Sequence, residues 1–118
     1  MGASFKDLVV WQKAVQLSSI IYRLSASFPA SEQFGITNQM RRASVSIASN
    51  IAEGYGRASK GEYIQFLGHA RGSNCELQTQ LVIANSLGFC SEETHEPAEK
   101  LSAEISRMLN ALMNKLRG

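Results

Sequence analysis

Apolar residues recur along the chain at the spacing of an α-helix rather than that of a strand. From residue 10 to residue 28 they follow a 4-3-4-3-4 pattern, which is the seam of a coiled-coil-like helical bundle and predicts a first helix over about residues 6–27. Pro29 follows this stretch and is expected to end the helix. The predicted seam consists of Val10, Ala14, Leu17, Ile21, Leu24 and Phe28.

A second helix is predicted from Thr37, which would cap it, to Tyr55. Gly54 and Gly56 lie at its end, where glycine suits the left-handed turn that often follows a helix. Its inner face is predicted to hold Met40, Ala43, Ser44, Ile47 and Ile51.

The clearest helix start is the capping box from Ser59 to Glu62. The third helix is then predicted to run to about Leu87, with Gly88 ending it. Its seam is predicted to hold Tyr63, Phe66, Ala70, Leu77, Leu81, Ala84 and Leu87.

The last helix is predicted to begin near Thr94, which would place Pro97 in the first turn. Glutamates gather at this start and Lys115 and Arg117 lie near the other end, an arrangement that complements the helix dipole. The predicted inner face consists of Leu101, Ile105, Met108, Leu112 and Leu116.

Short connections between long helices favour antiparallel neighbours, so the pattern predicts an all-α, up-down-up-down four-helix bundle. The chain has 118 residues, of which 44% are hydrophobic and 19% charged, typical of one packed domain over residues 1–118. No apolar run approaches the roughly 20 residues that span a bilayer, and the N-terminus lacks a signal-peptide pattern. Cys75 and Cys90 are too far apart for a disulfide on one helix, which favours reduced thiols and a cytoplasmic location.

The first two helices carry more apolar surface than one core requires. A second stripe lies away from the first seam, and residues 43–52 contain no charged side chain. A helix that is apolar on two sides requires two partners, and large aromatic residues are favoured anchors at interfaces. We therefore expect a homo-oligomer; a broad core within a monomer is the alternative. The predicted oligomer interface is Leu8, Trp11, Val15, Tyr22, Val45, Ala48 and Ala52.

Polar residues lie beside the seams of the second and third helices. Ser73 and His69 are four residues apart, but no nucleophile elbow or phosphate loop accompanies them. His69 and Glu76 lack the ligand spacing of a di-iron bundle. We therefore expect no catalytic site, no metal and no cofactor. The favoured interpretation is a structural polar network, within or between subunits, of Arg42, Asn50, Glu53, Ser73 and Glu76.

The net charge of +2 is too small to identify a nucleic-acid-binding protein by itself. Its distribution is uneven, because residues 1–75 hold eight Lys and Arg against four Asp and Glu, whereas residues 76–118 hold four against six. A binding surface for phosphates is thus a further interpretation. The candidate phosphate contacts are Arg41, Arg42, Arg57, Lys60 and Arg71.

Several blocks of sequence carry a family resemblance. They are the opening Asp7-Leu8-Val9-Val10-Trp11, the pair Phe28-Pro29, and the blocks Arg41-Arg42-Ala43, Asn50-Ile51-Ala52-Glu53-Gly54 and Gly72-Ser73-x-x-Glu76. In order and spacing they resemble the 23S rRNA intervening sequence proteins, over about residues 5–90. Asn74 and Cys75 depart from this pattern, because small or apolar residues are expected there.

The resemblance implies a left-handed antiparallel four-helix bundle that assembles as a homo-oligomer, with pentameric rings known in the family. Genes of this kind were first noticed inside insertions in ribosomal RNA genes, and no enzymatic activity is firmly assigned to their products. RNA or DNA binding, or scaffolding on RNA, is therefore an expectation by analogy. The alternative is a protein-interaction accessory subunit, such as that of a reverse transcriptase in a diversity-generating retroelement.

Overall fold

The four predicted helices are present in the computed structural model, which describes residues 3–118. No strand occurs in this part of the chain, so the all-α class is confirmed. The long helices are α1 (Val9–Ser25), α2 (Ile36–Tyr55), α3 (Lys60–Ser86) and α4 (Glu92–Arg117). Two short 3-10 turns, η1 (Phe5–Asp7) and η2 (Ala30–Glu32), precede α1 and α2.

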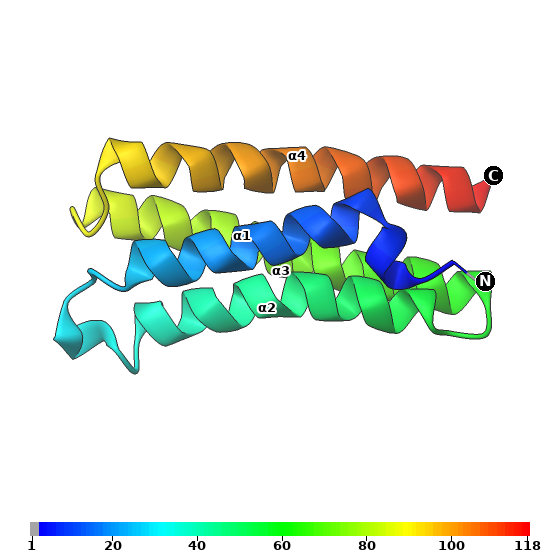
Figure 1. The fold of residues 1–118 in the computed structure, drawn as a ribbon, viewed down its shortest axis with the longest axis horizontal. Coiled ribbons are helices and arrows are strands. Elements are labelled where there is room, and N and C mark those ends of the chain that lie inside the picture. The colour runs from blue at the N-terminus through cyan, green and yellow to red at the C-terminus, as the bar shows by residue number, and fades with distance from the viewer. Residues whose placement is uncertain (1–2) are drawn as a thin grey trace.

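Helices that follow one another in sequence run antiparallel along a body of 44 × 24 × 22 Å (Figure 1). Each packs on the next, and α4 returns to pack on α1, so that the four enclose one core. Both chain ends lie at the end of the bundle that also holds the α2–α3 connection (Figure 1). The left-handed twist of the bundle stays a prediction.

The predicted inner faces of α1 and α2 are confirmed, because every apolar residue assigned to them is buried. The reason is that a 4-3 spacing keeps successive side chains on one side of a helix. The helix bounds differ from the prediction, since α1 begins at Val9 and ends at Ser25, four residues before Pro29. Residues 5–7 form the separate turn η1, which Ser4 caps.

The inner faces of α3 and α4 are rotated slightly from the prediction. In α3, Leu67 is fully buried, whereas Leu87 is 59% exposed beyond the end of the helix. In α4, Leu109 and Met113 are buried in the core, and Met108, Leu112 and Leu116 are only partly buried. A Cβ at Gly68 would lie 3.8 Å from the Met113 methyl carbon, an ordinary van der Waals contact, so Met113 packs over Gly68.

The helix ends show where local patterns mislead. Gly35, not Thr37, precedes α2, and Thr37 is buried in its first turn. Gly56 follows α2 in a right-handed conformation, so the predicted left-handed turn is wrong there, whereas Gly88 after α3 does have a positive φ of 77°. Ser59 starts α3 as predicted and accepts a hydrogen bond from the Glu62 amide at 3.1 Å.

The start of α4 also lies earlier than predicted. Ser91 precedes the helix, so Thr94 lies within its first turn rather than capping it. Pro97 therefore falls in the second turn and not in the first. Because proline has no amide hydrogen, the Glu93 carbonyl loses its usual partner four residues on. This end of α4 is consequently less regular in its hydrogen bonding than the prediction assumed.

Candidate assembly and nucleic-acid interfaces

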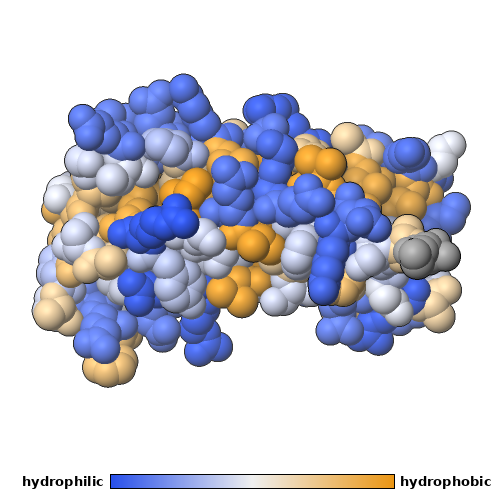
Figure 2. All heavy atoms as spheres, viewed as in Figure 1, coloured by the Kyte–Doolittle hydropathy of each residue, from blue (hydrophilic) through white to orange (hydrophobic). Residues whose placement is uncertain are grey.

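An apolar groove of about 440 Å³ lies between α1 and α2. Six of the seven predicted interface residues line it, and the seventh, Leu8, packs against the edge of the core. Figure 2 shows apolar surface in the middle of this face, bordered by polar side chains. The lining residues are Trp11, Val15, Ser18, Ser19, Tyr22, Val45, Ala48, Ser49 and Ala52.

The groove is exposed but held in shape. Val15, Tyr22 and Val45 are 40%, 44% and 43% exposed, which is high for apolar side chains gathered in one place. Beneath them the hydroxyls of Ser18 and Ser44 lie 3.2 Å apart and join α1 to α2. A preformed apolar groove of this kind loses little conformational entropy when a second surface covers it.

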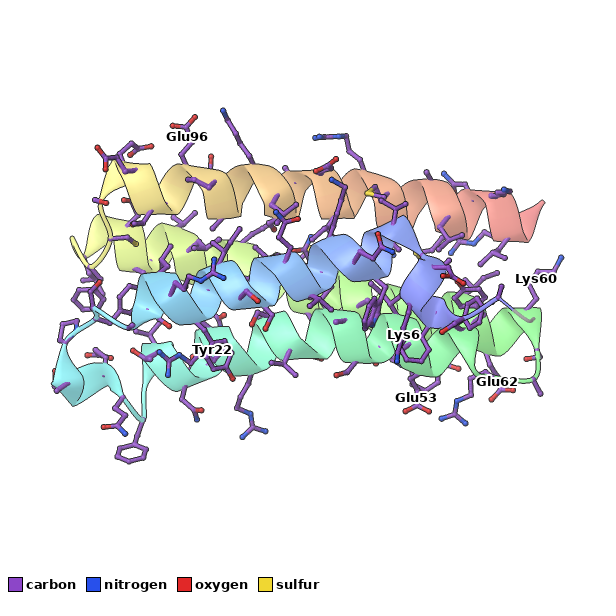
Figure 3. The ribbon with its side chains drawn as sticks, viewed as in Figure 1. Lys6, Tyr22, Glu53, Lys60, Glu62 and Glu96 are labelled. Atoms are coloured by element: carbon purple, nitrogen blue, oxygen red, sulfur yellow. The ribbon has the colours of Figure 1, made fainter. Side chains whose placement is uncertain are left out.

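Both ends of the groove are braced by contacts from outside it. At one end, Phe5 packs edge-on against Trp11 at 5.2 Å between ring centres. At the other end, the Arg41 guanidinium carbon lies 4.8 Å from the centre of the Tyr22 ring. Tyr22 is labelled in Figure 3. The two large aromatic residues of the groove are thus fixed in position.

Part of the predicted polar network joins α2 to α3 within one chain. The hydroxyls of Ser46 and Ser73 are 2.9 Å apart. Asn50 donates from Nδ2 to the Ser46 hydroxyl at 2.9 Å and to the Ser46 carbonyl at 2.8 Å. Ser46, which the prediction left out, is the residue that connects the other two. These bonds fix α2 against α3 in a single register.

The charged members of the predicted network do not take part in these hydrogen bonds. Arg42 and Glu76 are exposed and line a shallow hollow of about 350 Å³ together with Ser46. Glu53 instead pairs with Arg57, four residues on and just past the end of α2, at 3.3 Å. The five predicted residues therefore do not form one bonded network: Arg42 and Glu76 border the Ser46 cluster at the surface, whereas Glu53 lies apart with Arg57. Exposed charges remain solvated rather than entering the helix interface.

Aromatic and charged side chains gather around the α2–α3 connection. Arg57 lies 4.6 Å above the Phe66 ring and is paired with Glu53 and, at 3.8 Å, with Glu62. His69 meets the same ring edge-on at 5.5 Å. Figure 3 places Lys60, Glu53 and Glu62 at this end of the bundle.

Two tyrosines complete this group. Tyr55 and Tyr63 lie edge-on with ring centres 6.0 Å apart. Burial, and to a lesser extent the neighbouring Tyr55, raises the pKa of Tyr63 above its ordinary value. Both rings are half-buried, so each has one side against the protein and one toward solvent.

The five predicted phosphate contacts do not form one patch on a single chain. Arg41 is bound to the end of α1, donating from Nε to the Ser25 hydroxyl at 2.9 Å. Arg71 faces α4, where it donates to Asn110 Oδ1 at 3.0 Å. Arg57 and Lys60 lie together at the α2–α3 connection. Within residues 3–118, Arg42 and Lys60 make no ion pair, which leaves them available to a ligand.

A set of cations between α1 and α4 was missed by the sequence analysis. Lys13, Lys100 and Arg107 line a groove of about 540 Å³. Lys100 and Arg107 are seven residues apart on α4, which places them on one face of that helix. This spacing is visible in the sequence. Lys13 comes from a helix almost 90 residues away in sequence, so its proximity to them required the fold.

Residues 3–118 contain no group of three or more His, Cys, Asp or Glu side chains that could hold a metal ion. Cys75 and Cys90 are both free thiols, and burial raises the pKa of Cys90. No helix in the same range combines the length and apolar character that a membrane crossing requires.

Comparison of the chain with known proteins identifies a matching family. Residues 6–111 match the family model described as 23S rRNA-intervening sequence protein. No curated protein matches the chain. Among solved structures, it is similar to a protein of unknown function from the S23 ribosomal protein family of Bacteroides thetaiotaomicron. The two share 26% identity with a TM-score of 0.81, over 89% of this chain and 98% of the other.

Proposed function

Because this chain belongs to the 23S rRNA-intervening sequence protein family, we propose that it self-associates through the α1–α2 groove and that the assembly binds RNA without catalysing a reaction. The observation that carries the proposal is the groove itself. Its apolar residues come from two helices whose other faces already fill the core. A second copy of the chain supplies the surface that removes them from water.

The proposed RNA contact is the α2–α3 connection. Proteins that bind single-stranded nucleic acid combine cations for the phosphates with aromatic rings on which bases stack. Arg57 and Lys60 supply the cations, and Tyr55, Tyr63 and Phe66 supply half-exposed rings. An RNA phosphate must compete for Arg57 with two carboxylates, so a single copy binds weakly. Several copies in one assembly multiply this weak contact, as linked binding sites do.

Self-association is tested by a charge placed in the groove. Val45→Glu introduces a carboxylate that assembly would have to desolvate, which is strongly unfavourable without a partner. The matched control is Val82→Glu, since Val82 is an exposed valine of α3 outside the groove. Sedimentation velocity should show smaller particles for Val45→Glu and unchanged particles for the control. Equal sedimentation of the folded variants would contradict the assignment of this groove.

RNA binding is tested by filter retention of a labelled single-stranded oligonucleotide. With several phosphate contacts, affinity should fall about tenfold or more between about 50 and 200 mM salt. Lys60→Glu should weaken binding without unfolding the protein, because an acidic residue suits the first turn of α3. Arg23→Gln, at the far end of α1, is the control and should have no effect. No retention at about 50 mM salt would overturn the RNA proposal.

The alternative function, a protein-interaction accessory subunit as in a reverse transcriptase system, makes a different prediction in the same salt series. A partner interface with an apolar core depends little on ionic strength. A partner bound equally well at low and high salt, with no RNA retained, would favour this alternative.

A further inference from the structure

On the flank away from α2, α1 packs against α4 (Figure 1). A second groove follows this contact. It consists of two hollows, of about 540 and 280 Å³, which share Ile20 and Pro97 and are therefore continuous. It extends from Lys13 of α1 to Ser27 just past the end of that helix, about 20 Å at about 1.5 Å per residue. That length matches about four turns of a bound helix.

The floor of this groove is aliphatic. No aromatic side chain lines either hollow, in contrast to the α1–α2 groove with Trp11 and Tyr22. The absence matters, because nucleic-acid bases bind by stacking on aromatic rings. The aliphatic lining residues are Ile20, Leu24, Pro97, Leu101 and Ala103.

The rim of the groove is basic. Four cations line it, against the single carboxylate of Glu104. That carboxylate is already bound to Lys13, whose Nζ lies 3.2 Å from both of its oxygens. The four cations are Lys13, Arg23, Lys100 and Arg107.

Two of these cations have no acidic partner. Lys100 is paired with Glu96 at 2.8 Å, and Glu96 points outward from α4 (Figure 3). Arg23 and Arg107 make no ion pair within residues 3–118. Because α1 and α4 are antiparallel, Arg107 lies near Lys13 at one end of the groove and Arg23 near Thr94 at the other. Unpaired positive charge therefore brackets the aliphatic floor.

We propose that the α1–α4 groove binds an acidic amphipathic helix of a partner protein. Apolar side chains at i, i+3, i+4 and i+7 of such a helix would fill the aliphatic floor. Its acidic residues would meet Arg23 and Arg107 at the two ends. The inference goes beyond self-association and RNA binding, because the groove shares no residue with the α1–α2 groove or the α2–α3 connection.

The test uses a labelled peptide of about 14 residues, with leucine at i, i+3, i+4 and i+7 on one face and glutamate on the other. Fluorescence anisotropy against the full chain should show saturable binding. A peptide with the same leucines and lysine in place of glutamate should bind at least about tenfold more weakly. The double variant Arg23→Glu, Arg107→Glu should weaken binding of the acidic peptide to a similar degree, and Lys115→Glu, outside the groove, should not.

The outcomes separate this inference from the proposed function. Equal binding of the two peptides, or an acidic peptide unaffected by the double variant, would overturn it. Loss of RNA retention in the double variant, with no peptide binding, would also overturn it and reassign the groove to nucleic acid. Loss of RNA retention only in Lys60→Glu, with peptide binding intact, supports both proposals. Circular dichroism of each variant establishes that it remains helical.

Discussion

Asn74 of α3 and Ser102 of α4 form a reciprocal hydrogen-bonded pair in the centre of the core. Asn74 donates from Nδ2 to the Ser102 carbonyl at 2.9 Å, and the Ser102 hydroxyl donates to Asn74 Oδ1 at 2.7 Å. Nδ2 also donates to the Ser106 hydroxyl at 3.0 Å. Both partners of the pair are fully buried, so these bonds satisfy polar groups that water cannot reach. A pair of this kind permits only one register of α3 against α4.

Asn74→Ala should therefore destabilise the protein by about 2–4 kcal/mol, because it leaves the Ser102 carbonyl and hydroxyl with fewer partners in the core. Ser102→Ala should lower stability by about 1–3 kcal/mol, because it leaves the buried Asn74 Oδ1 without its donor while Asn74 keeps its other two hydrogen bonds. Asn110→Ala, on the exposed face of α4, is the control and should change stability by less than about 0.5 kcal/mol. Urea unfolding measures all three. Equal effects of Asn74→Ala and the control would contradict this role.

Gly54 lies where the backbone of α2 comes close to side chains of α3. A Cβ at this position would lie 2.8 Å from Phe66 Cβ and 3.1 Å from a ring carbon of Tyr63. Gly54→Ala should thus destabilise the protein by about 1–3 kcal/mol through overpacking. Gly72→Ala is the matched control within α3, where nothing lies within 4 Å of the added Cβ. There the change should stabilise by about 0.5–1 kcal/mol, as alanine does in a helix interior. Thermal unfolding should shift in opposite directions for the two variants.

The raised pKa of Tyr63 predicts a loss of protein stability at alkaline pH. Its pKa is raised in the folded chain, first by burial and then by Tyr55, so above the ordinary tyrosine value of about 10 the unfolded chain ionises first. The unfolded state then binds fewer protons, and the free energy of unfolding falls as the pH rises toward the folded pKa. Below the ordinary value this contribution is fully present.

Phenolate absorbance during a pH titration reports this shift directly. Tyr55→Phe should lower the Tyr63 pKa but leave it above the ordinary value, because burial acts first and remains. Tyr63→Phe should remove the corresponding part of the alkaline destabilisation. A Tyr63 that titrates like an exposed tyrosine in the folded protein would contradict the geometry of this cluster.

The helices and the α1–α2 groove could be predicted from the sequence because their signals are periodic and local. Two patterns indicate which sides of α1 and α2 avoid water. They are the seam from Val10 to Phe28 and the absence of charge over residues 43–52. By contrast, whether a polar residue on a seam is buried depends on its partner. The partner of Asn74 is Ser102, 28 residues away, and the periodicity of the sequence does not predict this pairing.

The charged surfaces could be predicted only in part, for a similar reason. Arg57 and Lys60 are neighbours in sequence and remain neighbours in space. Of the candidate network, Arg42 and Glu76 line one hollow, whereas Glu53 pairs with Arg57, because spacing along a helix does not show which exposed charges meet. The α1–α4 groove was missed because Lys13 and Arg107 belong to the first and last helices, which the bundle brings together only when it closes.

The central claim is that copies of this chain cover one another's α1–α2 grooves. Multi-angle light scattering of the wild-type protein at micromolar concentration tests it most directly. A mass of at least twice 12.9 kDa, and an integral multiple of it, is predicted, with five copies the number that the family resemblance favours. A single species of 12.9 kDa would contradict the claim.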